Sequence, residues 1–242
     1  MLRPAHRQRG ITLIELMIAS AISLVALAAV LTAYTASARH SRLQLESAHL
    51  YQQLYGIVQL ISRDLRRSGY WHFDPALVSP ASNPFQQGEN RLRTAAMADE
   101  PADSCVLLAY DLDGDGLVGT GQCAFGHCPD GTDDDNVEQF GFRLHDQALQ
   151  ARYGGGSLAC DSGYWQAVND PDVLVTRLAF HLHEDCLNLD DVDQPCAADS
   201  NRRLQQAVDI DIAAVLRRHP ETSLELHRRT VVRNTRLQEA PS

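Results

Sequence analysis

Residues Leu16 to Ala33 read LMIASAISLVALAAVLTA, a run of 18 residues without a charged residue, a glycine or a proline. At about 1.5 Å of rise per residue, a helix of this length matches the thickness of a bilayer core. The run therefore predicts a membrane span or the apolar part of a signal sequence.

The helical pattern continues beyond this run. No proline occurs from Ile11 to Arg67, and apolar residues recur at spacings of seven, four or three, which places them on one face of a helix. This stripe consists of Leu43, Leu50, Leu54, Ile57, Ile61 and Leu65. Arg66 and Arg67 suit the carbonyl end of a helix, and Gly69 suits a left-handed cap. The sequence predicts one helix of about 57 residues.

After Gly69 the sequence is interrupted by Pro75, Pro80 and Pro84, which exclude a regular helix there. Later segments are rich in β-branched and aromatic residues and have the pattern of strands. These segments are Cys105–Asp111, Val137–Leu144, Val173–His183, Ala207–Val215 and Ser223–Val232. We therefore predict an α+β fold, in which a long N-terminal helix packs its amphipathic half on an antiparallel β-sheet.

The charges are distributed unevenly along the chain. All 21 basic residues are arginines, against 31 acidic residues, and the net charge of −10 argues against a nucleic-acid groove as the main surface. Arg3, Arg7 and Arg9 precede the apolar run, whereas residues 70–242 carry 28 acids and 13 arginines. This asymmetry predicts a cytoplasmic N-terminus and a body outside the inner membrane.

The string RGITLIELMIA, from Arg9 to Ala19, contains a single acid, Glu15, beside the apolar run. An unpaired carboxylate is costly near hydrocarbon, so Glu15 needs to be neutral or to find a cation. If the chain were cut after Gly10, the new amine of Ile11 would lie one helical turn away and could neutralise a carboxylate of the same or a neighbouring chain.

These residues resemble the start of a type IV prepilin, whose leader ends in glycine and whose mature chain carries a glutamate four residues after its first residue. The resemblance implies that prepilin peptidase cleaves between Gly10 and Ile11 and methylates the amine of Ile11. It also implies that Glu15 acts in assembly.

Three further strings are similar to minor pilins of the PilW and prepilin peptidase-dependent protein B types. They are SRDLRRSGYW at Ser62–Trp71, DSCVLLAYDLDGDG at Asp103–Gly116 and VEQFGFRLHDQALQAR at Val137–Arg152. The resemblance implies a non-enzymatic minor pilin that helps to prime or cap a pilus, with prepilin peptidase, other minor pilins and the major pilin as partners. The implied parts are a leader (1–10), a transmembrane and assembly helix (11–38), its amphipathic continuation (39–69) and a periplasmic β-rich head (70–242).

Other interpretations stay open at this point. The N-terminus could be an ordinary signal peptide cut at Ala36–Ala38, or an anchor that is not cleaved. A minor pseudopilin of a type II secretion system shares the same leader and helix, and the head could instead be an adhesive or ligand-binding module. A membrane-tethered hydrolase would need a metal at His181 and His183, which share one face of a predicted strand.

All six cysteines follow the span, on the side predicted to be oxidising, which favours disulfides over free thiols. They are Cys105, Cys123, Cys128, Cys160, Cys186 and Cys196. Fifteen pairings are possible in principle. Short loops favour Cys123 with Cys128 and Cys186 with Cys196, leaving Cys105 for Cys160. A zinc site at Cys123, His127 and Cys128 is the competing interpretation.

The string DLDGDG, Asp111 to Gly116, has the spacing of a calcium-binding loop. Asp111, Asp113 and Asp115 stand at its first, third and fifth places, and the carbonyl of Leu117 would stand at the seventh. Gln122 occupies the twelfth place, where a bidentate glutamate is usual, so we expect a weak calcium site or a solvated turn. The acidic run 130–136 could add an oxygen.

Overall fold

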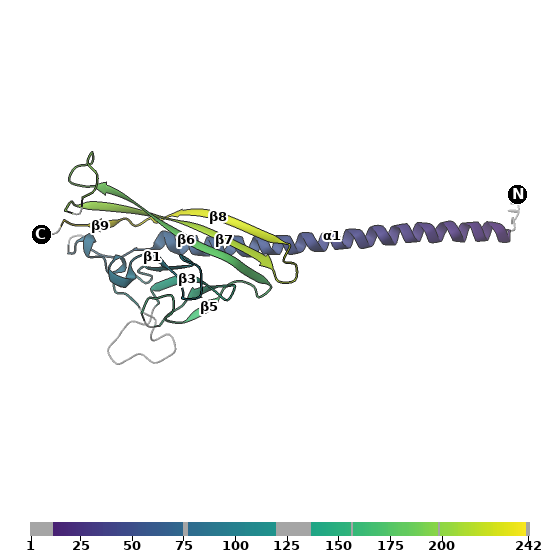
Figure 1. The fold of residues 1–242 in the computed structure, drawn as a ribbon, viewed down its shortest axis with the longest axis horizontal. Helices are drawn as coiled ribbons and strands as arrows, with labels where there is room; N and C mark the ends of the chain where they lie inside the picture. Colours follow the sequence, from purple (N-terminus) through teal and green to yellow (C-terminus); the bar gives the residue numbers. More distant parts are fainter. Residues whose placement is uncertain (1–11, 75–76, 120–136, 156, 198, 241–242) are drawn as a thin grey trace, which may run out of the picture. The chain divides into compact units, whose positions relative to one another are not determined.

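The computed structural model describes residues 12–74, 77–119, 137–155, 157–197 and 199–240. The chain divides into two compact units, Met1–Ala48 and His49–Ser242. Helix α1 (Leu13–Arg67) contributes to both units (Figure 1). The other elements belong to the second unit: η1 (Pro80–Ser82), η2 (Pro84–Gln86), η3 (Gly88–Asn90), β1 (Arg93–Ala95), β2 (Cys105–Ala109), β3 (Gln139–His145), β4 (Ala148–Arg152), β5 (Trp165–Ala167), β6 (Val173–Asn188), β7 (Arg202–Leu216), β8 (Ser223–Val231) and β9 (Arg236–Gln238).

Helix α1 ends where the sequence predicts. Gly69 has a φ of +71°, which confirms the left-handed cap, and its N–H donates to the carbonyl of Ala109 at 2.8 Å. A side chain at Gly69 would also collide with Gln86, since an added Cβ would lie 2.3 Å from its Nε2 atom. The cap thus joins the end of α1 to the end of β2.

The apolar stripe of α1 is buried over a shorter stretch than we predicted. Leu50, Leu54, Ile61 and Leu65 are at most 1% exposed, whereas Leu43 is 47% exposed. The prediction that the stripe packs from Leu43 onward is therefore wrong for its first member. Leu43 and Leu50 are seven residues apart, so Leu43 has no stripe residue three or four positions away on its own helix face.

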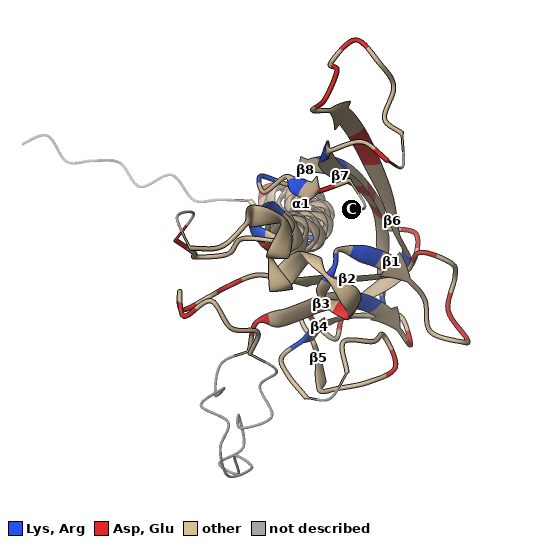
Figure 2. Ribbon diagram, turned by 90° about the vertical axis from the view of Figure 1, so that its left-hand side faces the viewer, with Lys and Arg blue, Asp and Glu red and all other residues tan. Residues whose placement is uncertain are grey.

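The strands form two antiparallel sheets where the sequence suggested one. The first sheet has the order β1-β2-β3-β4-β5, and the second has the order β6-β7-β8 with β9 paired to β7. Figure 2 looks along α1 and shows β6, β7 and β8 on one side of the helix and the first sheet on another. Residues 50–65 of α1 share one apolar core with both sheets. The predicted α+β class, a long helix packed with antiparallel sheets, is confirmed.

Strand β2 is buried along its whole length because both of its faces are covered. Val106 and Leu108 face the main core with α1. Cys105 and Leu107 face a smaller cluster that includes Cys160. Side chains alternate between the two faces of a strand, so one apolar run serves two clusters.

Candidate assembly, disulfide and metal sites

Thr12 and Glu15 form a reciprocal cap at the first turn of α1. The backbone N and the Oγ1 of Thr12 both donate to Oε2 of Glu15 at 3.0 Å, and the backbone N of Glu15 donates to Oγ1 of Thr12 at 3.3 Å. The spacing Thr-x-x-Glu is the sequence signal for this capping box. Glu15 therefore organises the start of the helix. Gly10 and Ile11 lie outside the described residues, so the cleavage site stays a prediction.

The N-terminal half of α1 has the surface of a membrane span. Large apolar side chains from Leu13 to Tyr34 are exposed all around the helix. The hydroxyls of Ser20, Ser23 and Thr32 donate to backbone carbonyls of the preceding turn at 2.7–2.9 Å, which satisfies them without water. In the described part of the chain, α1 alone is long and apolar enough to cross a membrane, by length and composition.

One disulfide joins Cys105 of β2 to Cys160, 55 residues later, with a Cα–Cα distance of 6.3 Å. Both cysteines are at most 5% exposed and pack with Leu107 and Leu158. The guanidinium of Arg143 on β3 donates to the carbonyl of Cys160. The bridge therefore fixes the loop between β4 and β5 against the outer face of the first sheet.

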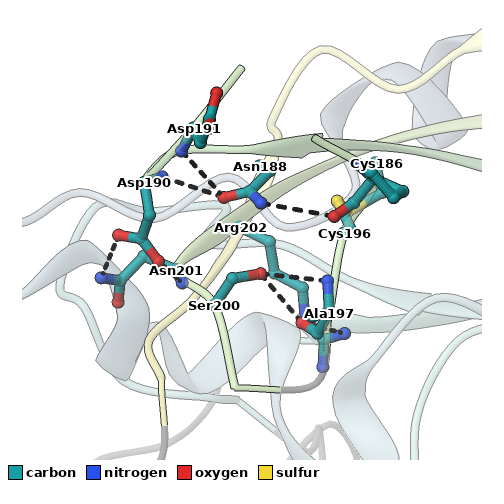
Figure 3. The surroundings of a disulfide bond; sticks show 10 residues. Cys186, Asn188, Asp190, Asp191, Cys196, Ala197, Ser200, Asn201 and Arg202 are labelled. Atoms are coloured by element: carbon teal, nitrogen blue, oxygen red, sulfur yellow. Dashed lines mark hydrogen bonds between the residues drawn. A yellow bond between two sulfur atoms is a disulfide. The ribbon is translucent and has the colours of Figure 1, made fainter. Parts of the chain in front are cut away.

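The second disulfide joins Cys186, near the end of β6, to Cys196 in the loop before β7. Figure 3 shows how this loop is held: Nδ2 of Asn188 donates to the carbonyl of Pro195 at 3.3 Å, and Ser200 donates to the carbonyl of Ala197 at 2.9 Å. The pairing of Cys186 with Cys196 is one that short loops favour, and the pairing of Cys105 with Cys160 is the one that remained for those two cysteines. The third pair, Cys123 with Cys128, lies outside the described residues, as does the competing zinc site.

The DLDGDG string forms a turn around the buried carboxylate of Asp111, which is 3% exposed. Oδ1 of Asp111 accepts from the backbone N of Gly114 at 2.6 Å, and Oδ2 accepts from those of His72 and Gly116 at 2.9 and 3.2 Å. The backbone N of Leu117 donates to Oδ1 of Asp115 at 2.7 Å. This network of hydrogen bonds holds the carboxylates of the turn in place. The role of the Leu117 carbonyl as a ligand stays a prediction.

A fourth acid, Glu138, joins the three aspartates from the residue before β3. One oxygen from each of Asp111, Asp113, Asp115 and Glu138 lies within 4.8 Å of the others. Oε1 of Glu138 accepts from the backbone N of Leu112, and Oε2 accepts from that of Gly119 at 2.9 Å. Burial raises the pKa of Glu138, and the charges of Asp111 and Asp113 raise it further, whereas the two backbone hydrogen bonds lower it by a smaller amount. A hard cation such as calcium suits this all-oxygen set.

We did not predict Glu138 as a ligand from the sequence. It lies 23 residues after Asp115, and Gln122 at the twelfth place of the loop is outside the described residues. The available signal was an acid directly before the apolar strand segment that begins at Gln139. A carboxylate that is 1% exposed in such a position needs hydrogen bonds or a cation.

Comparison with protein families gives two matches. A family model described as prepilin peptidase-dependent protein B matches residues 43–232, and one for the prokaryotic N-terminal methylation motif matches residues 5–31. The chain belongs to the prepilin peptidase-dependent protein B family. No curated protein and no solved structure matches the chain. The resemblance to type IV prepilins is thereby confirmed.

Family membership fits the structure at both ends of α1. A prepilin peptidase-dependent protein is a pilin-like protein that this peptidase processes, and the N-terminal methylation motif covers Glu15 and most of the apolar run. The motif and the exposed apolar helix indicate anchoring in a membrane. The match over residues 43–232 covers the buried half of α1 and strands β1 to β8.

The histidines of β6 do not form a metal centre with one another. His183 lies 2.8 Å from a carboxylate oxygen of Asp209, and His181 lies 3.5 Å from one of Asp211. His227 on β8 lies 2.7 Å from the other oxygen of Asp211. Among the described residues, no group of three potential metal ligands includes any of these histidines. Their geometry gives no support to a hydrolase.

Proposed function

We propose that the chain is a minor pilin of a type IV pilus that helps to prime or cap pilus assembly. The observation that carries this proposal is the presence of the methylation motif at residues 5–31 and the prepilin peptidase-dependent protein B match at residues 43–232 in one chain. Pilin-like families are structural, so we also propose that the protein is not an enzyme.

The proposal assigns a role to each part of the chain. Prepilin peptidase removes residues 1–10 and methylates the amine of Ile11. Residues 11–38 anchor the protein in the inner membrane, with the N-terminus on the cytoplasmic side, and then enter the pilus. Residues 39–69 continue the helix, and residues 70–242 form a periplasmic head that reaches the cell surface in the pilus. Other minor pilins and the major pilin are the assembly partners.

In this proposal, Glu15 sets the position of one helix relative to its neighbour in the assembled bundle. In an apolar helix bundle, its carboxylate is stabilised by the methylated amine of Ile11 on the same or a neighbouring chain. The capping bond to Thr12 keeps the carboxylate at the start of α1, where that amine would arrive. Charge pairing and helix capping are separate properties of Glu15, so two substitutions distinguish them.

We expect Glu15→Ala and Glu15→Gln, each expressed as the only copy, to reduce piliation by more than tenfold. Removing one partner of a desolvated charge pair costs about 2–5 kcal/mol, and each 1.4 kcal/mol is a factor of ten. Glutamine keeps the capping box and removes the charge. Pili are counted by electron microscopy, and N-terminal sequencing of both variants should still show a chain that begins at Ile11.

Glu46→Gln is the matched control, because it makes the same chemical change on the same helix outside the apolar run, where Glu46 pairs with the exposed side chain of Arg42 at 3.0 Å. It should leave piliation unchanged. Normal piliation with Glu15→Gln would show that Glu15 acts only as a helix cap. A mature chain that begins near Arg39 would establish an ordinary signal peptide. If the Glu15 variants kept their pili but lost protein secretion, the chain would be a pseudopilin of a type II secretion system.

We also propose that Asp111, Asp113, Asp115 and Glu138 bind calcium, with a dissociation constant of about 10⁻⁴–10⁻³ M. Glu138 adds a fourth carboxylate to the three aspartates, which favours a calcium site over a turn without a cation. At 10 mM calcium we expect the melting temperature of the purified chain to rise by about 3–6 °C over a chelated sample. The gain should shrink as the pH falls through the raised pKa of Glu138, because its protonated form is a poor ligand.

Asp113→Ala should remove the calcium effect, whereas Asp99→Ala, at an exposed acid outside the cluster, should preserve it. The melting curves are recorded by circular dichroism. Equal melting with calcium and with chelator at pH 7 would identify the loop as a turn held by its own hydrogen bonds.

A further inference from the structure

Three arginines that are distant in the sequence line the same two hollows of the second unit. Arg91 lies between η3 and β1, Arg202 begins β7 and Arg236 begins β9. The hollows have volumes of about 560 and 650 Å³, and both are lined by these arginines and by Gln238. We call Arg91, Arg202, Arg236 and Gln238 the arginine pocket.

The register of β7 and β9 places two of the arginines on one face of the sheet. Arg202 is paired with Gln238, and Leu204 is paired with Arg236. Directly paired residues project to the same face, as do residues two apart along a strand. Arg202 and Arg236 are therefore diagonal neighbours of like charge, close enough for their long side chains to reach the same hollow.

No ion pair within the described residues neutralises these three charges. None of the three guanidinium groups takes part in an ion pair there. Nη1 of Arg202 donates to the carbonyl of Ala197 at 3.4 Å (Figure 3), but its Nε is buried and has no hydrogen-bond partner among those residues. Two acids also line the hollows, and each accepts a hydrogen bond from a neutral side chain: Glu184 from Gln206 at 3.0 Å, and Glu239 from Ser79 at 2.8 Å.

The electrostatics of Arg236 agree with this picture. Burial lowers the pKa of its guanidinium, and the charges of Arg91 and Arg202 lower it further, while Glu184 opposes them. The pocket therefore concentrates positive charge on a chain whose net charge is −10. A long polyanion such as DNA would be repelled by the rest of that chain, whereas a single compact anion would reach the pocket.

We propose that the arginine pocket binds a carboxylate group of another polypeptide. Planar guanidinium groups match the two oxygens of a carboxylate, and Gln238 can donate a further hydrogen bond. The larger hollow is also lined by Leu182, which is half-buried, so it suits an acidic residue beside an apolar one. The proposal is independent of a role in pilus assembly, because it rests on the second unit alone.

The disulfide Cys186–Cys196 lies in the wall of the larger hollow. Ala197, whose carbonyl accepts the bond from Arg202, directly follows Cys196. This bridge therefore limits the positions of the Arg202 side chain before any ligand arrives, which lowers the entropic cost of binding.

The test uses the purified chain in detergent micelles and two fluorescent peptides with amidated ends, one centred on Leu-Glu-Leu and one on Leu-Gln-Leu. We expect the Glu peptide to bind at least tenfold more tightly than the Gln peptide in an anisotropy titration at low salt. Arg236→Gln and Arg91→Gln should each weaken binding at least tenfold, since hydrogen bonds to charged groups contribute about 1.5–3 kcal/mol. Arg91 is exposed, so its variant tests the pocket without disturbing the core.

Arg218→Gln is the matched control, because Arg218 is 72% exposed and lies beside Asp172, outside the pocket. It should leave the affinity for the Glu peptide unchanged. Without peptide, Arg236→Gln should melt no lower than the native chain, since it removes repulsion, whereas a purely structural arginine would lower the melting temperature. Equal affinity for the two peptides, no binding of the Glu peptide at millimolar concentration, tighter binding of a DNA duplex, or an equal loss in Arg218→Gln would each overturn the proposal.

Discussion

A chain in which Cys105 and Cys160 are both replaced by alanine should lose about 4 kcal/mol of unfolding free energy. The bridge closes a loop of 55 residues, and restricting a loop of that length in the unfolded chain accounts for about this amount. Both cysteines are nearly buried, so the loss of packing adds to the effect. The measurement is urea unfolding of the mature chain in detergent, followed by the fluorescence of its two tryptophans, Trp71 and Trp165.

Replacing Cys186 and Cys196 by alanine provides the comparison. This bridge spans only 10 residues, and the same loop-closure estimate gives about 3 kcal/mol. We therefore expect the two variants to rank in the order of their loop lengths. The reverse order, or a native free energy of unfolding in both variants, would contradict the assignment of these bridges as structural.

Leu54→Ala should cost about 2–5 kcal/mol, the range for a leucine removed from a closed core. Leu54 is fully buried in the core that α1 shares with both sheets, so its removal leaves a cavity bounded by several elements. The same urea titration measures the effect, and an unchanged slope would show that the folded state has kept its compactness.

Leu43→Ala is the control, because it makes the same chemical change on the same helix at a residue that is 47% exposed. Exposed substitutions usually change stability by less than about 0.5 kcal/mol. An equal loss in the two variants would mean that the stripe is buried from Leu43 onward, as its spacing alone predicts.

The parts of the fold that follow from local patterns were predictable from the sequence. The length of α1, its end at Gly69 and the strand beginning at Cys105 depend on periodicity and capping, which a single sequence records. The division into two sheets was not predictable in this way. It arises from the hydrogen-bond pairing of β1 to β5 in one sheet and of β6 to β9 in the other, and the apolar pattern of a single strand does not show which other strands it pairs with.

The long hairpin of β6 and β7 illustrates a second limit. The predicted strands ended at His183 and began at Ala207, whereas the structure pairs residues up to Asn188 and from Arg202. These extensions are polar and held by backbone bonds and a disulfide, so the apolar pattern that identifies strands is missing from them. The arginine pocket depends on these extensions, and therefore could not be found from sequence spacing.

The cluster of four carboxylates shows the same limit. The three aspartates have a recognisable spacing, but Glu138 reaches them through the pairing of β2 with β3, which brings Tyr110 and Glu138 together by a 3.1 Å backbone bond. Long-range pairing of this kind leaves no fixed spacing in the sequence. In the sequence, Glu138 could be recognised only as an acid directly before an apolar segment.

The folded unit is closed by bonds between its first and last elements. Oγ1 of Thr230 donates to Oγ of Ser62 at 3.0 Å, and Nδ2 of Asn234 donates to the carbonyl of Arg67 at 3.0 Å. The helix is made first during synthesis, yet its buried face and its last carbonyls acquire these partners only when the final residues have emerged. Folding of this unit must therefore wait for the residues up to Asn234, and contacts of such sequence separation make it slow. Until then, the apolar face of residues 50–65 lacks the part of its cover that the last strands supply, and it is exposed to aggregation.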